Sequence, residues 1–178
     1  MTACPRNVST TACRPIRRGA RLRATLAPVA IVAIVAGLPL ALNWVDLTPV
    51  LQAPLAIQLH LLAVAGAIAL TGVLMLGVKG SRLHRALGWT WSVFMVTAAA
   101  SALFIRSASG LPSVAGFGPL HLFAGIVLVA VPRAVLAARR HNVPAHARAM
   151  SAMVAGALGI AGLFAFLPGR LLWRVMFG

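Results

Sequence analysis

The sequence predicts an all-α integral membrane protein, a bundle of five transmembrane helices with its N-terminus in the cytoplasm. Three observations favour this fold class: 61% of the 178 residues are hydrophobic, 10% are charged, and long apolar runs recur along the chain. A water-soluble domain carries about 25% charged residues, so most of this chain's surface is not suited to water. A helix needs about 20 apolar residues to cross roughly 30 Å of hydrocarbon, and each run is near that length.

The expected elements follow in chain order. Residues 1–24 carry six arginines and no acidic residue, which predicts a disordered basic cytoplasmic tail. Residues 25–178 then form the five-helix transmembrane domain. Its apolar runs are continuous instead of alternating with period two, so they predict helices and not the strands of a barrel. These runs cover residues 25–43, 54–78, 86–105, 119–138 and 149–168.

The cations predict the orientation. Six lie in the tail and seven lie in or beside the loops after the second and fourth runs, against only Arg106, Arg170 and Arg174 on the other side. By the positive-inside rule the richer side is cytoplasmic, which predicts a multi-pass protein of the bacterial inner (plasma) membrane with the lipid bilayer as its surroundings. Cations placed between apolar runs also argue against nucleic-acid binding, which needs a clustered basic face.

Histidines are the main candidates for chemistry, because the only acidic residue of the chain, Asp46, lies outside the apolar runs. His60 and His121 are expected near the outer ends of two helices, and His84 and His146 near the cytoplasmic ends of two others. Two imidazoles from facing helices can hold a haem iron, so the pairs His60/His121 and His84/His146 suggest up to two b-type haems. Metal binding without haem, a proton relay and structural hydrogen bonding remain open.

Glycines and arginines beside these histidines extend the haem hypothesis. Gly88 and Gly125 lie four residues after His84 and His121, on the same helix face, where they leave room for a flat macrocycle. Arg82, Arg85 and Arg148 are placed to pair with haem propionates at the inner site. For each arginine taken singly, setting membrane orientation is the favoured interpretation. No Cys-x-x-Cys-His is present, so covalent c-type haem is excluded.

Two tryptophans follow His84 closely. Trp89 and Trp91 are expected to anchor the third helix at the cytoplasmic interface, where amphipathic rings favour the headgroup zone.

Four short motifs together resemble a family of small bacterial membrane proteins, domain of unknown function 2306. The resemblance covers about residues 50–178 and implies a membrane location without a function. One position departs from the family pattern, Ala147, where an arginine is usual. The matching residues are Lys79, Gly80, His84, Arg85, Gly88, Trp89 and Trp91; Pro119 and His121; Ala145, His146 and Met150; and Pro168, Gly169 and Arg170.

The arrangement of the histidines, more loosely, is similar to that of the cytochrome b561 family, in which helices pair through histidine to hold two haems. This similarity implies a membrane oxidoreductase or electron carrier with an electron donor and an acceptor. The alternative is a non-redox small membrane protein with a structural or accessory role. Hydrolysis is disfavoured, because no carboxylate lies within a run to act as a general acid.

Overall fold

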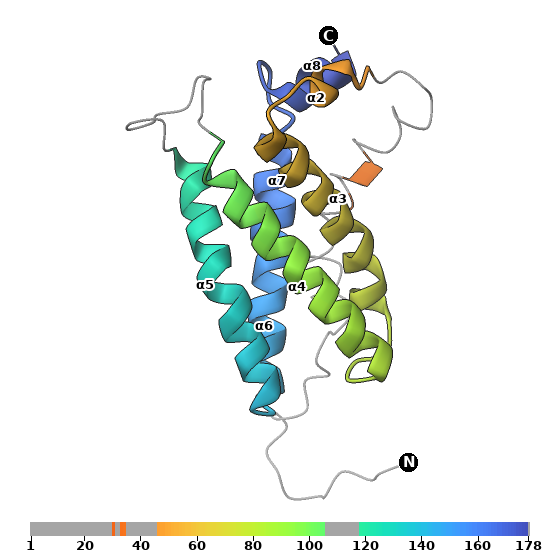
Figure 1. The fold of residues 1–178 in the computed structure, drawn as a ribbon. Helices are drawn as coiled ribbons and strands as arrows, with labels where there is room; N and C mark the ends of the chain where they lie inside the picture. Colours follow the sequence, from red (N-terminus) through yellow and green to blue (C-terminus); the bar gives the residue numbers. More distant parts are fainter. Residues whose placement is uncertain (1–29, 31–32, 35–45, 106–117, 178) are drawn as a thin grey trace, which may run out of the picture.

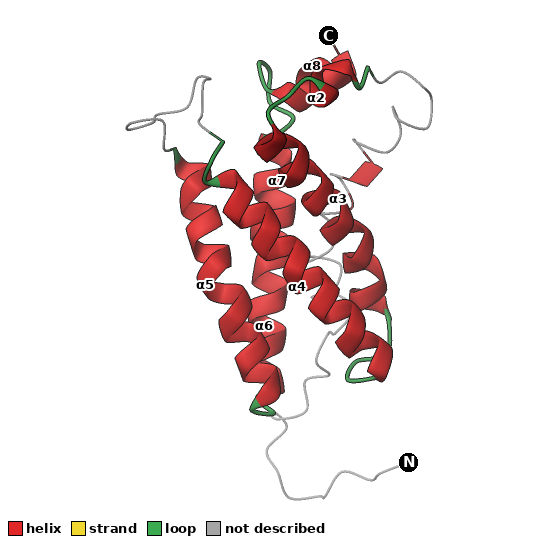
Figure 2. Cartoon of the chain, viewed as in Figure 1, coloured by secondary structure: helices red, strands yellow, loops and turns green. Residues whose placement is uncertain are grey.

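The computed structural model describes residue 30, residues 33–34, 46–105 and 118–177. The predicted tail, Arg106 and nearly all of the first predicted span, 25–43, lie outside these residues. Within them the chain forms helices joined by loops and no strand, which confirms the all-α fold (Figure 2). The helices are α2 (Thr48–Leu51), α3 (Leu55–Leu76), α4 (Arg82–Ala102), α5 (Pro119–Arg139), α6 (Val143–Met153), the π-helix η1 (Val154–Ile160), α7 (Ala161–Phe164) and α8 (Leu171–Phe177).

The long helices form a bundle. α4 lies along α3 and also packs on α5, α5 packs on α6, and η1 contacts both α3 and α5 (Figure 1). The short helices α2 and α8 pack against each other at one end, which we call the capped end. The opposite end carries the loops 77–81 and 140–142, and we call it the arginine end.

Three stretches of the described chain are long and apolar enough to cross a membrane: Leu55–Leu76, Leu120–Arg139 and Val143–Phe164. The third runs through α6, η1 and α7. α4 is as long, but Arg82, His84 and Arg85 in its first turn make it more polar, as do its serines and threonines. Several of those hydroxyls bond to carbonyls of their own helix, as Ser92 does to Gly88 O at 2.8 Å. Such local bonding satisfies hydroxyl groups within an apolar bundle.

Local sequence explains where the helices begin. Pro49, Pro119 and Pro144 stand in first turns, where a missing N–H removes no helical hydrogen bond. The side chains of Ser81 and Asn142 accept hydrogen bonds from His84 N at 3.1 Å and Ala145 N at 3.2 Å, capping α4 and α6.

The predicted runs match the helices with two shifts. The third helix starts at Arg82 and not at residue 86, and the fifth starts at Val143 and not at residue 149. Hydropathy placed both starts too late, because Arg82, Arg85 and Arg148 lower the mean hydropathy at the beginnings of these helices. The capping hydrogen bonds of Ser81 and Asn142 nevertheless begin the helices there.

Alanines are frequent in the core, beside larger side chains such as Trp91 and Met95. Buried residues of α3 to α6 and η1 include Ala67, Ala99, Ala124, Ala134 and Leu158. Alanines at helix contacts let the backbones approach closely, which is how membrane bundles pack.

Many other leucines, with several valines and phenylalanines, lie on the outside, Leu62 being 69% exposed. Apolar side chains over the outer faces of the long helices suit contact with lipid chains.

Candidate functional site

The histidines of the described bundle divide between its two ends. α3 and α5 start at the capped end, so His60 and His121 lie there. α4 and α6 start at the arginine end, so His84 and His146 lie there. This is the distribution in depth that the hypothesis of two haem sites requires. The hydrogen bonds of the individual rings then decide what each pair can do.

His60 ties α3 to α4. Its Nδ1 lies 2.8 Å from Ala98 O and 3.5 Å from the hydroxyl of Ser101. Because a carbonyl oxygen only accepts, Nδ1 carries the proton, and in the neutral ring Nε2 keeps its lone pair. A metal-binding histidine commonly has one nitrogen held in this way. The same bond also acts as a link between two helices without any ligand.

His121 has the opposite arrangement. Its Nδ1 accepts a hydrogen bond from Gly118 N at 3.1 Å, which caps the first turn of α5. The proton of the neutral ring therefore lies on Nε2, so this nitrogen cannot offer a lone pair to a metal. The pair His60/His121 thus does not present two matched Nε2 ligands in this structure.

His84 and His146 both lie at the arginine end, near the starts of α4 and α6. Both of these helices pack on α5. Nδ1 of His146 donates to Ala134 O of α5 at 3.0 Å, so its Nε2 keeps the lone pair. Nδ1 of His84 is buried and has no hydrogen-bond partner among the described residues. A buried polar atom without a partner is uncommon and is often explained by a missing ligand or water.

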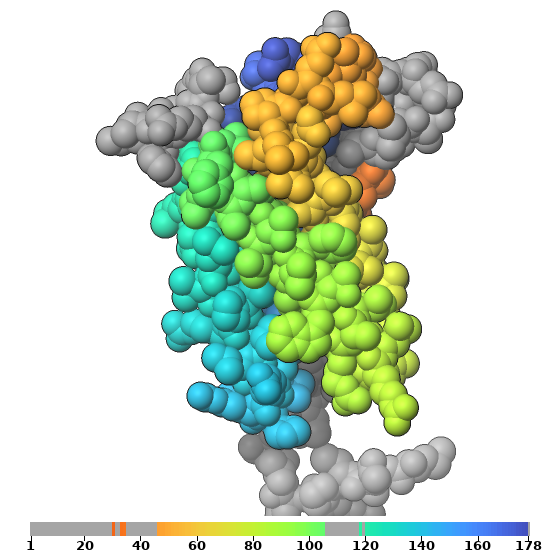
Figure 3. Space-filling model, in the orientation of Figure 1, coloured from red at the N-terminus to blue at the C-terminus, as the bar shows by residue number. Residues whose placement is uncertain are grey.

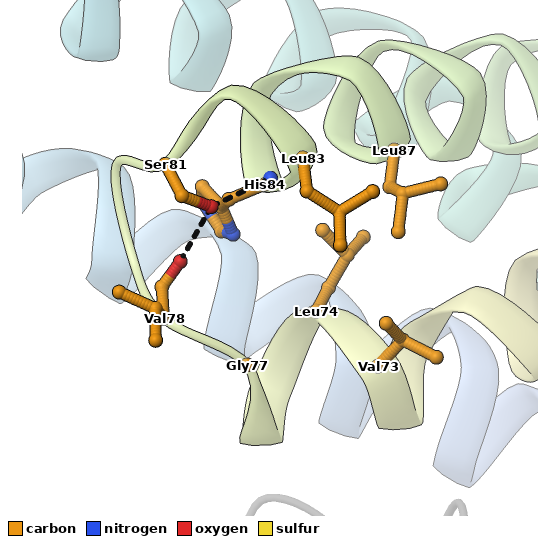
Figure 4. Close-up of a pocket in the computed structure, with 8 residues that line it drawn as sticks. All are labelled: Val73, Leu74, Gly77, Val78, Ser81, Leu83, His84 and Leu87. Atoms are coloured by element: carbon orange, nitrogen blue, oxygen red, sulfur yellow. Dashed lines mark hydrogen bonds between the residues drawn. The ribbon is translucent and has the colours of Figure 1, made fainter.

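The surroundings of His84 leave only a small hollow (Figure 4). It holds about 30 Å³ and lies between the end of α3, with Val73 and Leu74, and the start of α4, with Ser81 and His84. A pocket for a drug-sized ligand or cofactor is about ten times larger, whereas this hollow suits one water.

Two predicted glycines differ in their setting. A Cβ atom placed on Gly88 or Gly125 would meet no described atom within 4 Å, so neither is in close contact with a neighbouring backbone. Gly88 is half-buried, but Gly125 is exposed. The open space at Gly125 is therefore the outside of the bundle. Gly88 alone has the setting expected of a residue beside a bound group.

The predicted arginine partners, Arg82, Arg85 and Arg148, are exposed at the arginine end. Such exposed positions suit headgroups as well as haem propionates. Within the described residues no cluster of three or more histidine, cysteine, aspartate or glutamate side chains could hold a metal ion, so a pair of ligands is the most these residues offer.

One prediction about this end is wrong. Trp91 is 2% exposed in the core and donates from Nε1 to the Thr71 hydroxyl at 3.0 Å, whereas Trp89 is 57% exposed as an anchor would be. Residues two apart point to different sides of a helix, so Trp89 and Trp91 could not both face the headgroups. That spacing was the signal that could have identified the buried link between Trp91 and Thr71.

Comparison with known proteins gives one match. The family described as "Predicted membrane protein (DUF2306)" matches residues 57–172, a stretch that includes all four histidines of the two pairs. No curated protein and no solved structure matches the chain.

Proposed function

The chain belongs to the DUF2306 family of predicted membrane proteins, and from that premise we propose that it is a transmembrane electron carrier with one b-type haem held by His84 and His146. The observation that supports this most is that both histidines lie near the starts of helices that pack on α5 at the arginine end, together with the bond that leaves the lone pair on Nε2 of His146. A bound haem would supply one-electron transfer at this end of the membrane.

The histidine nitrogens are the feature that fits a haem iron, and the two pairs differ in the nitrogens that they offer. His84 and His146 offer two nitrogens, with the half-buried Gly88 beside one of them. His121 at the other pair uses Nδ1 to cap its helix, so we propose no second haem there. The hollow beside His84 has room for about one water, so the proposal depends on the two donor nitrogens and not on a preformed slot.

Orientation belongs to the same proposal. The three apolar spans, α4 and the run at 25–43 would give five crossings of the inner membrane, with the N-terminus and the arginine end in the cytoplasm. The cation asymmetry of the sequence supports this orientation. A reporter fused after Gly178 should then be extracytoplasmic, and a cytoplasmic reporter would reverse the assignment.

The visible spectrum of the detergent-purified protein tests the haem proposal. We expect a b-type absorbance that is lost in both His84→Ala and His146→Ala and kept in His60→Ala and His121→Ala. Thermal unfolding of each variant shows whether the loss reflects unfolding. A colourless wild-type protein expressed with ample haem, or a spectrum that survives His146→Ala, contradicts the proposal.

A non-redox structural role has its own supporting observation. His60 and His146 both donate from Nδ1 to a backbone carbonyl of a neighbouring helix, Ala98 O and Ala134 O. As links between helices they need no ligand. In that case His60→Ala and His146→Ala lower thermal stability by similar amounts, and neither the wild type nor any variant absorbs in the visible range.

A further inference from the structure

The arginine end carries cations for which this chain has no counter-charge. Arg82, Arg85, Arg139, Arg140 and Arg148 are all exposed there. The single acidic residue of the sequence, Asp46, lies at the capped end, where Asp46 N bonds to Val175 O of α8 at 3.3 Å. Its Oδ1 accepts from Thr48 N at 2.9 Å, and hydrogen bonding to Thr48 lowers the pKa of this carboxyl. The anions that balance the arginines must therefore come from outside the chain.

Lysine and arginine are used differently at this end. Lys79, the only lysine of the sequence, turns back on α3 and donates from Nζ to Leu74 O and Met75 O at 2.6 Å and to Gly77 O at 3.2 Å. Its ammonium group thus serves the last carbonyls of the helix. The other exposed cations are arginines, whose planar guanidinium can form two parallel hydrogen bonds to one phosphate.

The position of these arginines in the bundle indicates which anions they can reach. They lie in or near the two loops that end the spans Leu55–Leu76 and Leu120–Arg139, and both loops are at the lower end of the bundle in Figure 1 and in Figure 3. The ends of membrane-spanning helices lie at the depth of the lipid headgroups. Phospholipid phosphates are therefore the anions that these guanidinium groups reach first.

We infer that the arginine end is a binding surface for anionic phospholipids, recognised through guanidinium–phosphate pairs. This surface does not depend on the proposed haem. It predicts that the protein prefers anionic lipid around it, and that the preference depends on arginine geometry as well as on charge. A lysine keeps the charge that sets orientation but cannot form the two parallel bonds.

The test uses the full-length protein reconstituted in nanodiscs of phosphatidylcholine mixed with phosphatidylglycerol. Native mass spectrometry of the released protein counts the lipids that stay bound. For the wild type we expect phosphatidylglycerol to be enriched over its share in the disc. The variant R139K/R140K, outside the proposed haem site, should lower that enrichment by about twofold or more, since the bidentate bonds are lost.

A matched control uses the capped end. R174K makes the same chemical change there at an exposed arginine of α8 and should leave the enrichment unchanged. R139Q/R140Q also removes charge and should weaken the preference by about fivefold per residue. If the glutamine variant fails to insert, the lysine variants still decide. The inference is overturned by equal retention of both lipids in the wild type, by an unchanged preference in R139K/R140K, or by an equal loss in R174K.

Discussion

The two ends of the bundle use the same residue type for different purposes. Each end has one histidine on each of two helices. At the capped end His60 is bonded to Ala98 O, and His121 accepts a hydrogen bond that caps its own helix. At the arginine end His146 donates from Nδ1 to Ala134 O and keeps the lone pair on Nε2, as His60 does, whereas Nδ1 of His84 is buried with no hydrogen-bond partner among the described residues. The two ends therefore differ in His121 and His84. The number and depth of histidines therefore do not define a site, because the hydrogen bond at one ring nitrogen determines what the other can bind.

The largest difference between the two ends is expected when a large side chain replaces the glycine that follows His84 or His121. Gly88→Leu should remove any b-type absorbance, whereas Gly125→Leu should keep it, because Gly125 faces outward. Neither glycine has a described atom within 4 Å of an added Cβ, so we expect both variants to fold. The measurement is the reduced-minus-oxidised spectrum alongside a thermal melt. Equal spectra in both variants would remove Gly88 from the site.

Of the five predicted spans, three correspond to helices long and apolar enough to cross a membrane, because length and apolarity determine them. Runs 54–78 and 119–138 match α3 and α5 closely. The sequence could not predict the roles of His60 and His146, because their acceptors, Ala98 O and Ala134 O, belong to other helices and backbone carbonyls leave no mark in the sequence. The role of His121 was within reach, since Gly118-Pro119 before it is a helix start at which the third residue can bond back.

A second prediction concerns the link between α3 and α4 that lies nearer the arginine end. Thr71→Val removes the hydroxyl that accepts from Trp91 Nε1 and leaves a buried N–H without a partner. The free energy of unfolding should fall by about 1 kcal/mol, the usual scale for such bonds between membrane helices. Thr90→Val is the control, because the Thr90 hydroxyl is exposed and bonds only to Ala86 O of its own helix. If Thr90→Val lowers the free energy of unfolding more than Thr71→Val does, the hydrogen bond between Trp91 and Thr71 is not what stabilises the contact between α3 and α4.

A third and smaller effect is expected at the loop of the arginine end. Lys79→Met removes the ammonium that bonds to the last carbonyls of α3, which water can partly replace because the site is exposed. We expect a loss of about 0.5–1 kcal/mol, on the scale of a cation at a helix C-terminus. Arg82→Met removes a charge from the same loop without such bonds and should cost less. If the two variants unfold alike, charge and not capping stabilises this loop.

The smallest effect, of opposite sign, concerns His141 in the turn between α5 and α6. It has φ 58°, a left-handed conformation that costs a residue with a Cβ about 1 kcal/mol relative to glycine. His141→Gly relieves this strain but raises the conformational entropy of the unfolded chain. The free energy of unfolding should therefore rise by only about 0.5 kcal/mol. The neighbouring Arg140, at φ −86°, has no such strain, and Arg140→Gly should destabilise by about 1 kcal/mol. Urea or thermal unfolding of the two variants in one detergent compares them directly. If His141→Gly instead destabilises the protein, the His141 side chain makes a stabilising interaction. The arginine end would then have a third histidine with a structural role, whereas the capped end has two.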